Sequence, residues 1–311
     1  MFLHPLMSSL VLEQVLNGLQ LGVMLFMIAA GLTLVFGVMG VLNLAHGALY
    51  MCGAFAAAFV AAETGSVPLG ILAALPVAAL LGFVIERLVI SRLYARDHLD
   101  QVLATFGIVL FANEMVRILF GPRPLFLDVP AFAAGTVEVL PGTPYPAWRL
   151  AIILAGLVVA GGLALLIERT RLGMLIRAGA QNRRMVAALG VDIGRLYAVL
   201  FALGGLLAGL AGAMAGPVLA VQVGMGEPVL ILAFVVIVIG GIGSVKGAFA
   251  GAIIVGLADT LGRAYLPQLA RELLPPAAAD QIGAALASMT IYLLMAVVLA
   301  IRPKGVFGGR D

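Results

Sequence analysis

Charged residues are scarce in this chain, and their scarcity excludes an ordinary soluble protein. Only 11% of the 311 residues are Asp, Glu, Lys or Arg, whereas soluble domains carry about 25%. Hydrophobic residues make up 63% of the chain. A water-soluble fold of this length has no interior large enough to hide that much apolar surface. Lipid must therefore be the solvent for most of the sequence.

Cysteine and histidine are also rare. The one cysteine, Cys52, excludes an intrachain disulfide and a cysteine-based metal site. The histidines, His4, His46 and His98, lie far apart and form no His-x-x-x-His pattern, so we predict no metal site and no catalytic residue. The net charge of +3 rests on few charges, and we expect no nucleic-acid partner.

A nucleotide-binding loop is missing as well. The nearest approach to Gly-x-x-x-x-Gly-Lys-Ser/Thr is the stretch 240–247, where Lys246 is followed by glycine and lies against an apolar run. We therefore expect a chain that is not an enzyme and binds no cofactor of its own. If transport is active, ATP hydrolysis must take place on another subunit.

Long apolar runs are abundant, and runs of about 18 or more such residues are typical of transmembrane helices. They predict an all-α polytopic membrane protein with about nine spans in a single domain, residues 1–311. Eight or ten spans also fit, because two regions break at glycines rather than at charges. The expected spans are 12–38, 44–62, 68–90, 102–120, 148–168, 196–219, 227–243, 247–265 and 283–301.

The basic residues predict the orientation of the chain. Loops 86–101 and 168–195 and the C-terminal tail carry most of the arginines and fall on one side with this span count. Because Lys and Arg concentrate in cytoplasmic loops, that side is predicted to be the cytoplasm, with the C-terminus in it. The Pro-rich loop 121–147 and the segment 266–281 are placed on the opposite, extracytoplasmic side.

Segment 168–195 contains six arginines against two acidic residues and has apolar runs on both sides. Its central part has helical periodicity, and Gly190 is placed to end the helix. Ala178, Asn182, Met185, Val186 and Leu189 share one expected face, and Arg177, Gln181 and Arg184 share another. An interfacial helix against anionic lipid headgroups and a helix that docks into a partner both fit these residues.

Two stretches of similar pattern, 36–49 and 239–250, suggest an internal repeat. Each contains Gly-x-x-Gly, then a polar residue, then a basic or imidazole side chain before Gly-Ala. Glycine breaks a helix at little cost, and broken helices build polar sites inside many transporters. We therefore predict a gate or pathway role for four glycines: Gly37, Gly40, Gly240 and Gly243.

Acidic groups inside the expected spans are further pathway candidates, because charges are costly in hydrocarbon. Glu114 and Asp259 are the main ones, and Glu227 is a third. Glu114 precedes Arg117 by three residues, and Asp259 precedes Arg263 by four, so an ion pair on one helix face is the simpler interpretation of both. So few acids disfavour a carrier powered by protons or sodium.

Amide and imidazole groups also lie inside spans. Asn43 and His46 have no polar neighbour in sequence, and Asn113 adjoins an acidic residue. Contact with the transport pathway is one interpretation of the first two. The simpler one is hydrogen bonding to backbone groups that the Gly37–Gly40 break sets free.

Four stretches together resemble the branched-chain amino acid ABC transporter permeases, the LivH-type subunit. They are NGLQLGVMLFMIAAGLTLVFGVMGVLNLAHGALYMCGA (17–54), RAGAQNRRMVAALGVD (177–192), IGGIGSVKGAFAGA (239–252) and RPKGVFG (302–308). Their order and spread over most of the chain make the resemblance far more specific than any single stretch.

The resemblance implies an inner-membrane permease that forms half of a translocation pathway. It implies four kinds of partner: a second LivM-like permease, two ATP-binding subunits that carry ATP and Mg, a periplasmic substrate-binding protein, and membrane lipid. It also implies that an ATPase binds a coupling helix made by Arg177, Ala178, Gly179, Ala180, Gln181, Asn182, Arg184, Met185 and Gly190. Relatives carry urea, short amides or aromatic acids, so the substrate stays open, and a stand-alone secondary transporter is the rival from another class.

Overall fold

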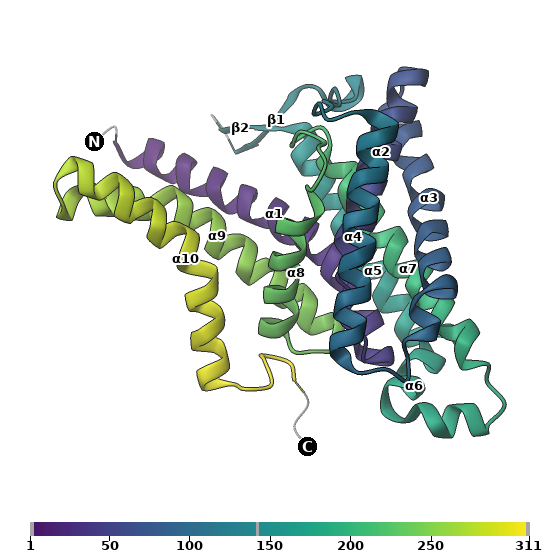
Figure 1. The fold of residues 1–311 in the computed structure, drawn as a ribbon. Coiled ribbons are helices and arrows are strands. Elements are labelled where there is room, and N and C mark those ends of the chain that lie inside the picture. The colour runs from purple at the N-terminus through teal and green to yellow at the C-terminus, as the bar shows by residue number, and fades with distance from the viewer. Residues whose placement is uncertain (1–2, 141–142, 309–311) are drawn as a thin grey trace.

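The computed structural model describes residues 3–140 and 143–308 and is almost entirely helical (Figure 1). Short 3-10 turns at Ile90–Arg92 and Ala131–Ala133 and a hairpin of β1 (Thr136–Leu140) and β2 (Thr143–Pro146) complete it. The helices are α1 (Leu3–Met39), α2 (Ala45–Thr64), α3 (Val67–Leu88), α4 (His98–Phe120), α5 (Ala147–Arg169), α6 (Arg171–Ala188), α7 (Ile193–Ala215), α8 (Gly226–Gly240), α9 (Val245–Leu273) and α10 (Pro276–Ile301).

Eight helices in the described part of the chain are long and apolar enough to cross a bilayer, which confirms the polytopic helical class. One of the nine expected spans, 227–243, corresponds to α8, which has only 15 residues. At 1.5 Å per residue it reaches about 22 Å, less than the roughly 30 Å of the hydrocarbon core. The hydropathy of 227–243 identified an apolar helix correctly, but that helix is too short to span on its own.

The segment expected as an extracytoplasmic loop, 266–281, is mostly helical. Helix α9 continues to Leu273 through Pro267, and α10 begins at Pro276, so only a short turn separates them. The charged residues of α9 made its end look like a loop in the sequence. Segment 121–147 is a true connection. Its Leu125 bridges Val221 in the α7–α8 connection, and Tyr145 of the hairpin donates to the Asn17 side chain of α1.

Both predicted glycine breaks are present. Gly40 has φ +68° and separates α1 from α2, and Gly241 and Gly243 have φ +103° and +82° between α8 and α9. A side chain is strained in this left-handed region, whereas glycine is not. Residues 40–44 are non-helical, so α2 begins only at Ala45.

Helices α1, α2 and α7 form the centre of the fold, and α3, α4, α5 and α10 are largely exposed on its outside. The basic connections share one end of the molecule: α6, the α3–α4 connection and residues 302–308 after α10 lie at the lower end of Figure 1, and the hairpin lies at the upper end. The structure thus places the basic segments on one side, as the charge pattern predicts.

Small residues let the central helices approach to backbone contact. A Cβ on Gly205 of α7 would lie 2.5 Å from the Ala78 carbonyl oxygen of α3. A Cβ on Gly212 would lie 2.0 Å from the Tyr50 carbonyl oxygen of α2. Gly205 and Gly212 of α7 therefore pack against two different helices, and close van der Waals contact stabilises both pairs without a hydrophobic driving force.

We predict that Gly212→Ala destabilises the fold, because its methyl group would force α2 and α7 apart. The cost of such overpacking is about 1–3 kcal/mol, measured as a lower midpoint of thermal unfolding in detergent. Gly107→Ala in α4 is the matched control, since a Cβ there meets nothing within 4 Å. Equal midpoints for the two variants would contradict close α2–α7 packing.

Candidate coupling and pathway sites

The coupling segment begins and ends at specific capping groups. The Thr170 hydroxyl accepts a hydrogen bond from the Gly173 amide at 3.0 Å and caps the start of α6. Gly190, at φ +85°, ends the segment, as predicted. The Asp192 carboxylate then accepts from the Arg195 amide at 3.0 Å and caps α7. Side-chain caps thus fix both junctions of α6 with the spans.

Asn182 interrupts α6, which the sequence pattern did not predict. Its backbone angles, φ −154° and ψ 90°, are extended, and its side-chain oxygen accepts a hydrogen bond from the Met185 amide at 3.0 Å. Asn182 therefore acts as the N-cap of a second short helix that ends at Ala188. The expected continuous face from Ala178 to Leu189 does not exist, because the chain turns at Asn182.

One side of α6 packs against the membrane-spanning helices. Ile176, Gly179 and Val186 are buried. A Cβ at Gly179 would lie 3.3 Å from Val38 of α1 and 3.6 Å from Leu196 of α7. The segment thus contacts two of the three central helices directly.

The other side of α6 is exposed. Residues 180–185 face solvent, and Met185 and Leu189 are 60% and 77% exposed. Exposed apolar side chains among basic residues are typical of a surface that binds another protein.

The two Gly-x-x-Gly stretches meet in space. A Cβ on Gly37 of α1 would lie 2.8 Å from the Cα of Gly243 in the α8–α9 connection. Gly240 approaches Gly247 equally closely, whereas Gly40 faces open space. Three of the four predicted gate glycines therefore take part in close backbone contacts, and the contact of Gly37 with Gly243 joins the repeated motifs.

His46 and Asn43 are both fully buried. The His46 Nε2 atom lies 3.0 Å from the carbonyl oxygen of Ile28, well before the glycine break, and its ring packs between Gly31 and Gly204. The expectation that His46 bonds to backbone freed at Gly37–Gly40 is therefore wrong. The Asn43 amide has no hydrogen-bond partner within the described residues, so its expected backbone partner is absent there.

The acidic candidates form the ion pairs expected from their spacing. Arg117 lies 2.9 Å from Glu114, and both side chains are more than half exposed. Arg263 donates to both carboxylate oxygens of Asp259, at 3.0 and 2.9 Å, and Asp259 is buried. Pairing and hydrogen bonding offset the cost of holding these charges at membrane depth.

One pair crosses between distant helices. The side-chain amide of Asn113 on α4 donates to Glu227 on α8 at 2.7 Å. Sequence reasoning had grouped Asn113 with its neighbour Glu114 instead. The signal that links Asn113 to Glu227 is tertiary, since 114 residues separate them.

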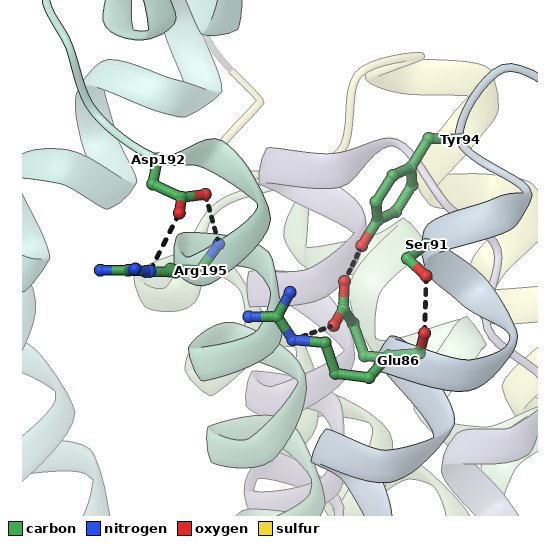
Figure 2. Close-up of polar contacts among 6 residues, drawn as sticks. Glu86, Ser91, Tyr94, Asp192 and Arg195 are labelled. Carbon is green, nitrogen blue, oxygen red and sulfur yellow. Dashed lines mark hydrogen bonds and ion pairs between the residues drawn. The ribbon is translucent and has the colours of Figure 1, made fainter.

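A buried acid, Glu86, was missed by the sequence analysis. It lies in the last turns of α3, accepts a hydrogen bond from the Tyr94 hydroxyl and lies 3.7 Å from Arg87. Figure 2 shows this group beside Asp192 and Arg195, at the start of α7. Burial, and the hydrogen bond to Glu86, raise the pKa of Tyr94, so its hydroxyl remains a donor. The only feature of the sequence that marks Glu86 is that it is an acidic residue inside an apolar run.

A cross-helix ion pair lies at the end of the molecule that carries α6. Lys246, in the first turn of α9, is 2.9 Å from Glu168, near the end of α5. Beside them is a cavity of about 480 Å³ among α1, α5, α6 and α9, whose lining includes Thr33, Arg177 and Phe249. Within the described residues no group of three His, Cys, Asp or Glu side chains could hold a metal ion.

Non-helical backbone at membrane depth occurs where protein encloses it or where it lines a water-filled path. The breaks at residues 40–44 and 241–244 lie at the end of the molecule that carries α6. Gly40, Ile242 and Gly243 are exposed there, and the buried Asn43 side chain has no hydrogen-bond partner among the described residues. Broken helices with buried polar groups are typical of helical transport proteins rather than of a simple membrane anchor.

The chain belongs to the family described as branched-chain amino acid transport system / permease component, whose model matches residues 14–301. It is 31% identical to the high-affinity branched-chain amino acid transport system permease protein BraD of Pseudomonas aeruginosa, over 96% of this chain and 95% of that protein. LivH of Escherichia coli K12, a protein of the same description, is 28% identical over the same shares.

A more distant relative is the ribose import permease protein RbsC of Haemophilus influenzae. It is 27% identical over 78% of this chain and 75% of its own length. No solved structure matches the chain.

We predict that Asn182→Ala loosens the second half of α6, because it removes the cap of that short helix. Loss of an N-cap costs about 1 kcal/mol, which corresponds to roughly fivefold faster hydrogen exchange in residues 183–189. Asn182→Ser keeps a capping oxygen and should exchange like the native chain. If the alanine and serine variants exchange alike, the proposed cap is wrong.

Proposed function

We propose that this chain is a permease subunit of a binding-protein-dependent ABC importer for branched-chain amino acids or a related small polar solute. In this role it forms half of the translocation pathway beside a LivM-like permease. Two cytosolic subunits hydrolyse ATP with Mg, and a periplasmic protein delivers the substrate. Urea, short amides and aromatic acids are the alternative substrates within the same family. The membrane is the bacterial inner membrane, with the C-terminus in the cytoplasm.

The observation that carries this proposal is the form of α6. It projects from the end of the molecule that holds the basic connections, and it is fixed to the spans at both ends. Its buried side contacts α1 and α7, while Met185 and Leu189 stay exposed. A partner that grips the exposed side and moves can therefore displace two central helices, which is what alternating access requires.

A stand-alone secondary transporter receives less support. Such a carrier needs a buried acid that can take up and release a proton or sodium ion. Asp259, Glu114 and Glu227 each have a side-chain partner, as does Glu86. Pairing of this kind favours a structural role for these acids and an energy source outside the chain.

We predict that the double substitution Arg184→Glu with Met185→Asp leaves membrane insertion intact but abolishes coupling to the ATPases. It replaces a cation and an exposed apolar contact with two acids at the centre of the docking surface. ATPase that co-purifies with the permease should fall by about tenfold or more, as for loss of interface hot spots.

The matched control for that experiment is Arg96→Glu with Leu99→Asp. Both residues are exposed at the same end of the molecule, Arg96 on the α3–α4 connection and Leu99 in the first turn of α4. Native amounts of bound ATPase are expected with the control. Full, stimulated ATPase activity in the α6 variant would contradict the docking role.

We predict that a cysteine at Gln181, in a Cys52→Ser background, reacts with a membrane-impermeant maleimide only after spheroplasts are permeabilised. The proposed orientation puts α6 in the cytoplasm and the hairpin outside. Glu138→Cys on the hairpin is the control and should react in intact spheroplasts. Reaction of the Gln181→Cys variant from outside would invert the topology.

A further inference from the structure

The cavity beside α6 has the chemistry of a small-molecule site. Its volume, about 480 Å³, lies within the range of ligand pockets, about 300–1,000 Å³. Phe26 of α1 and Phe249 of α9 contribute to an apolar lining and pack edge to face, with their ring centres 5.1 Å apart. An aliphatic group would be stabilised there by removal from water.

Opposite charges line one part of the same cavity. Glu168 and Lys246 form an ion pair at 2.9 Å, and their side chains are 52% and 77% exposed. Arg177 of α6 adds a second cation to the lining. An anionic lipid headgroup would meet the carboxylate of Glu168 as well as the cations. A zwitterion, in contrast, finds a partner for each of its charges.

A third feature is an unpartnered polar group in the wall. Thr33 of α1 lines the cavity and is 2% exposed, and its hydroxyl has no hydrogen-bond partner within the described residues. Buried hydroxyl groups nearly always form a hydrogen bond, because a buried hydroxyl without a partner costs free energy. The hydroxyl oxygen itself is covered, so a polar ligand group in the cavity would satisfy Thr33 after a small shift of the wall.

We propose that this cavity binds an amino acid with an aliphatic side chain, entering from the side on which α6 lies. The carboxylate bonds to Lys246 and Arg177, the ammonium bonds to Glu168, and the side chain lies against the phenylalanines. The choice of ligand rests on the proposed function as an amino acid permease, and in that orientation the site faces the cytoplasm.

Occupancy of this site changes the contacts between α5 and α9. The ligand competes for both members of the Glu168–Lys246 pair, which joins the last turn of α5 to the first turn of α9. The cavity also borders Gly37 and Gly243, where the two repeated motifs touch. The transported amino acid, once it accumulates inside the cell, thus binds where α6 meets the broken segments.

The test is equilibrium binding of radiolabelled leucine to the full chain in phosphatidylcholine nanodiscs, without binding protein or nucleotide. Competition is measured with leucinamide, which lacks the carboxylate, and with 4-methylpentanoate, which lacks the ammonium group. Each should bind at least about tenfold more weakly than leucine, the value of one charge-assisted hydrogen bond.

Two substitutions test the charged side chains that line the cavity. Lys246→Met should reduce leucine affinity by about tenfold or more and reduce the preference over leucinamide to the part that Arg177 supplies. Glu168→Gln should abolish the preference over 4-methylpentanoate. Arg195→Met, which removes a cation from another exposed ion pair of the same end, is the matched control and should bind leucine normally.

A third substitution examines the interior without touching a charge. Ala164→Phe fills part of the cavity and should reduce leucine affinity by about tenfold or more through loss of space. Gly161→Leu, on an open part of α5, is its control and should bind leucine normally. Monodisperse gel filtration establishes that each variant is folded.

Three results would overturn the proposal. The first is that the native chain binds no leucine, and the second is that Lys246→Met and Ala164→Phe both keep the native affinity for leucine. The third is that leucine does not bind, while native mass spectrometry finds a phospholipid bound to the native chain and absent from Lys246→Met. Failure of the importer role is a separate outcome, because it shows as absence of co-purifying ATPase while leucine binding persists.

Discussion

The constraint on which this structure depends is that lipid offers the backbone no hydrogen-bond partners. Eight long helices satisfy their own backbone groups, whereas the non-helical segments at residues 40–44 and 241–244 cannot. Those segments lie at the end of the molecule that carries α6, where Gly40, Ile242 and Gly243 are exposed, and close helix packing encloses their other residues at least in part. Glycine serves both needs: it permits the left-handed turn at Gly40 and the backbone contact of Gly212 with Tyr50.

The same enclosure decides where polar side chains can lie. Asp259 is buried with an arginine whose Nε donates to both carboxylate oxygens, and Glu86 is buried with a tyrosine hydroxyl. The pair of Lys246 with Glu168 lies instead at the end that carries α6, where partial exposure lowers the cost of charge. The proposed docking helix, the ion pair and the cavity are therefore neighbours. A movement of α6 reaches the broken segments through few intervening contacts.

Part of the site could be predicted because its signals are local. The i,i+3 and i,i+4 pairs of Glu114 and Asp259 follow from helix geometry, and Gly190 ends its segment as its type suggests. The break at Asn182 could not be predicted, because an asparagine that caps a second helix looks the same as one on a helix surface. His46 was misjudged for a related reason: its partner, Ile28, is 18 residues away.

The sequence by itself determined the class of protein, the apolar helices, the glycine breaks and the basic segment between spans. Each of these depends on hydropathy, charge or backbone freedom within a short window. Only the tertiary structure decided that Gly37 meets Gly243, that Asn113 meets Glu227 and that Lys246 meets Glu168. In a chain whose lipid-facing and protein-facing surfaces are both apolar, hydropathy does not distinguish the two. Helix packing therefore selects the partners.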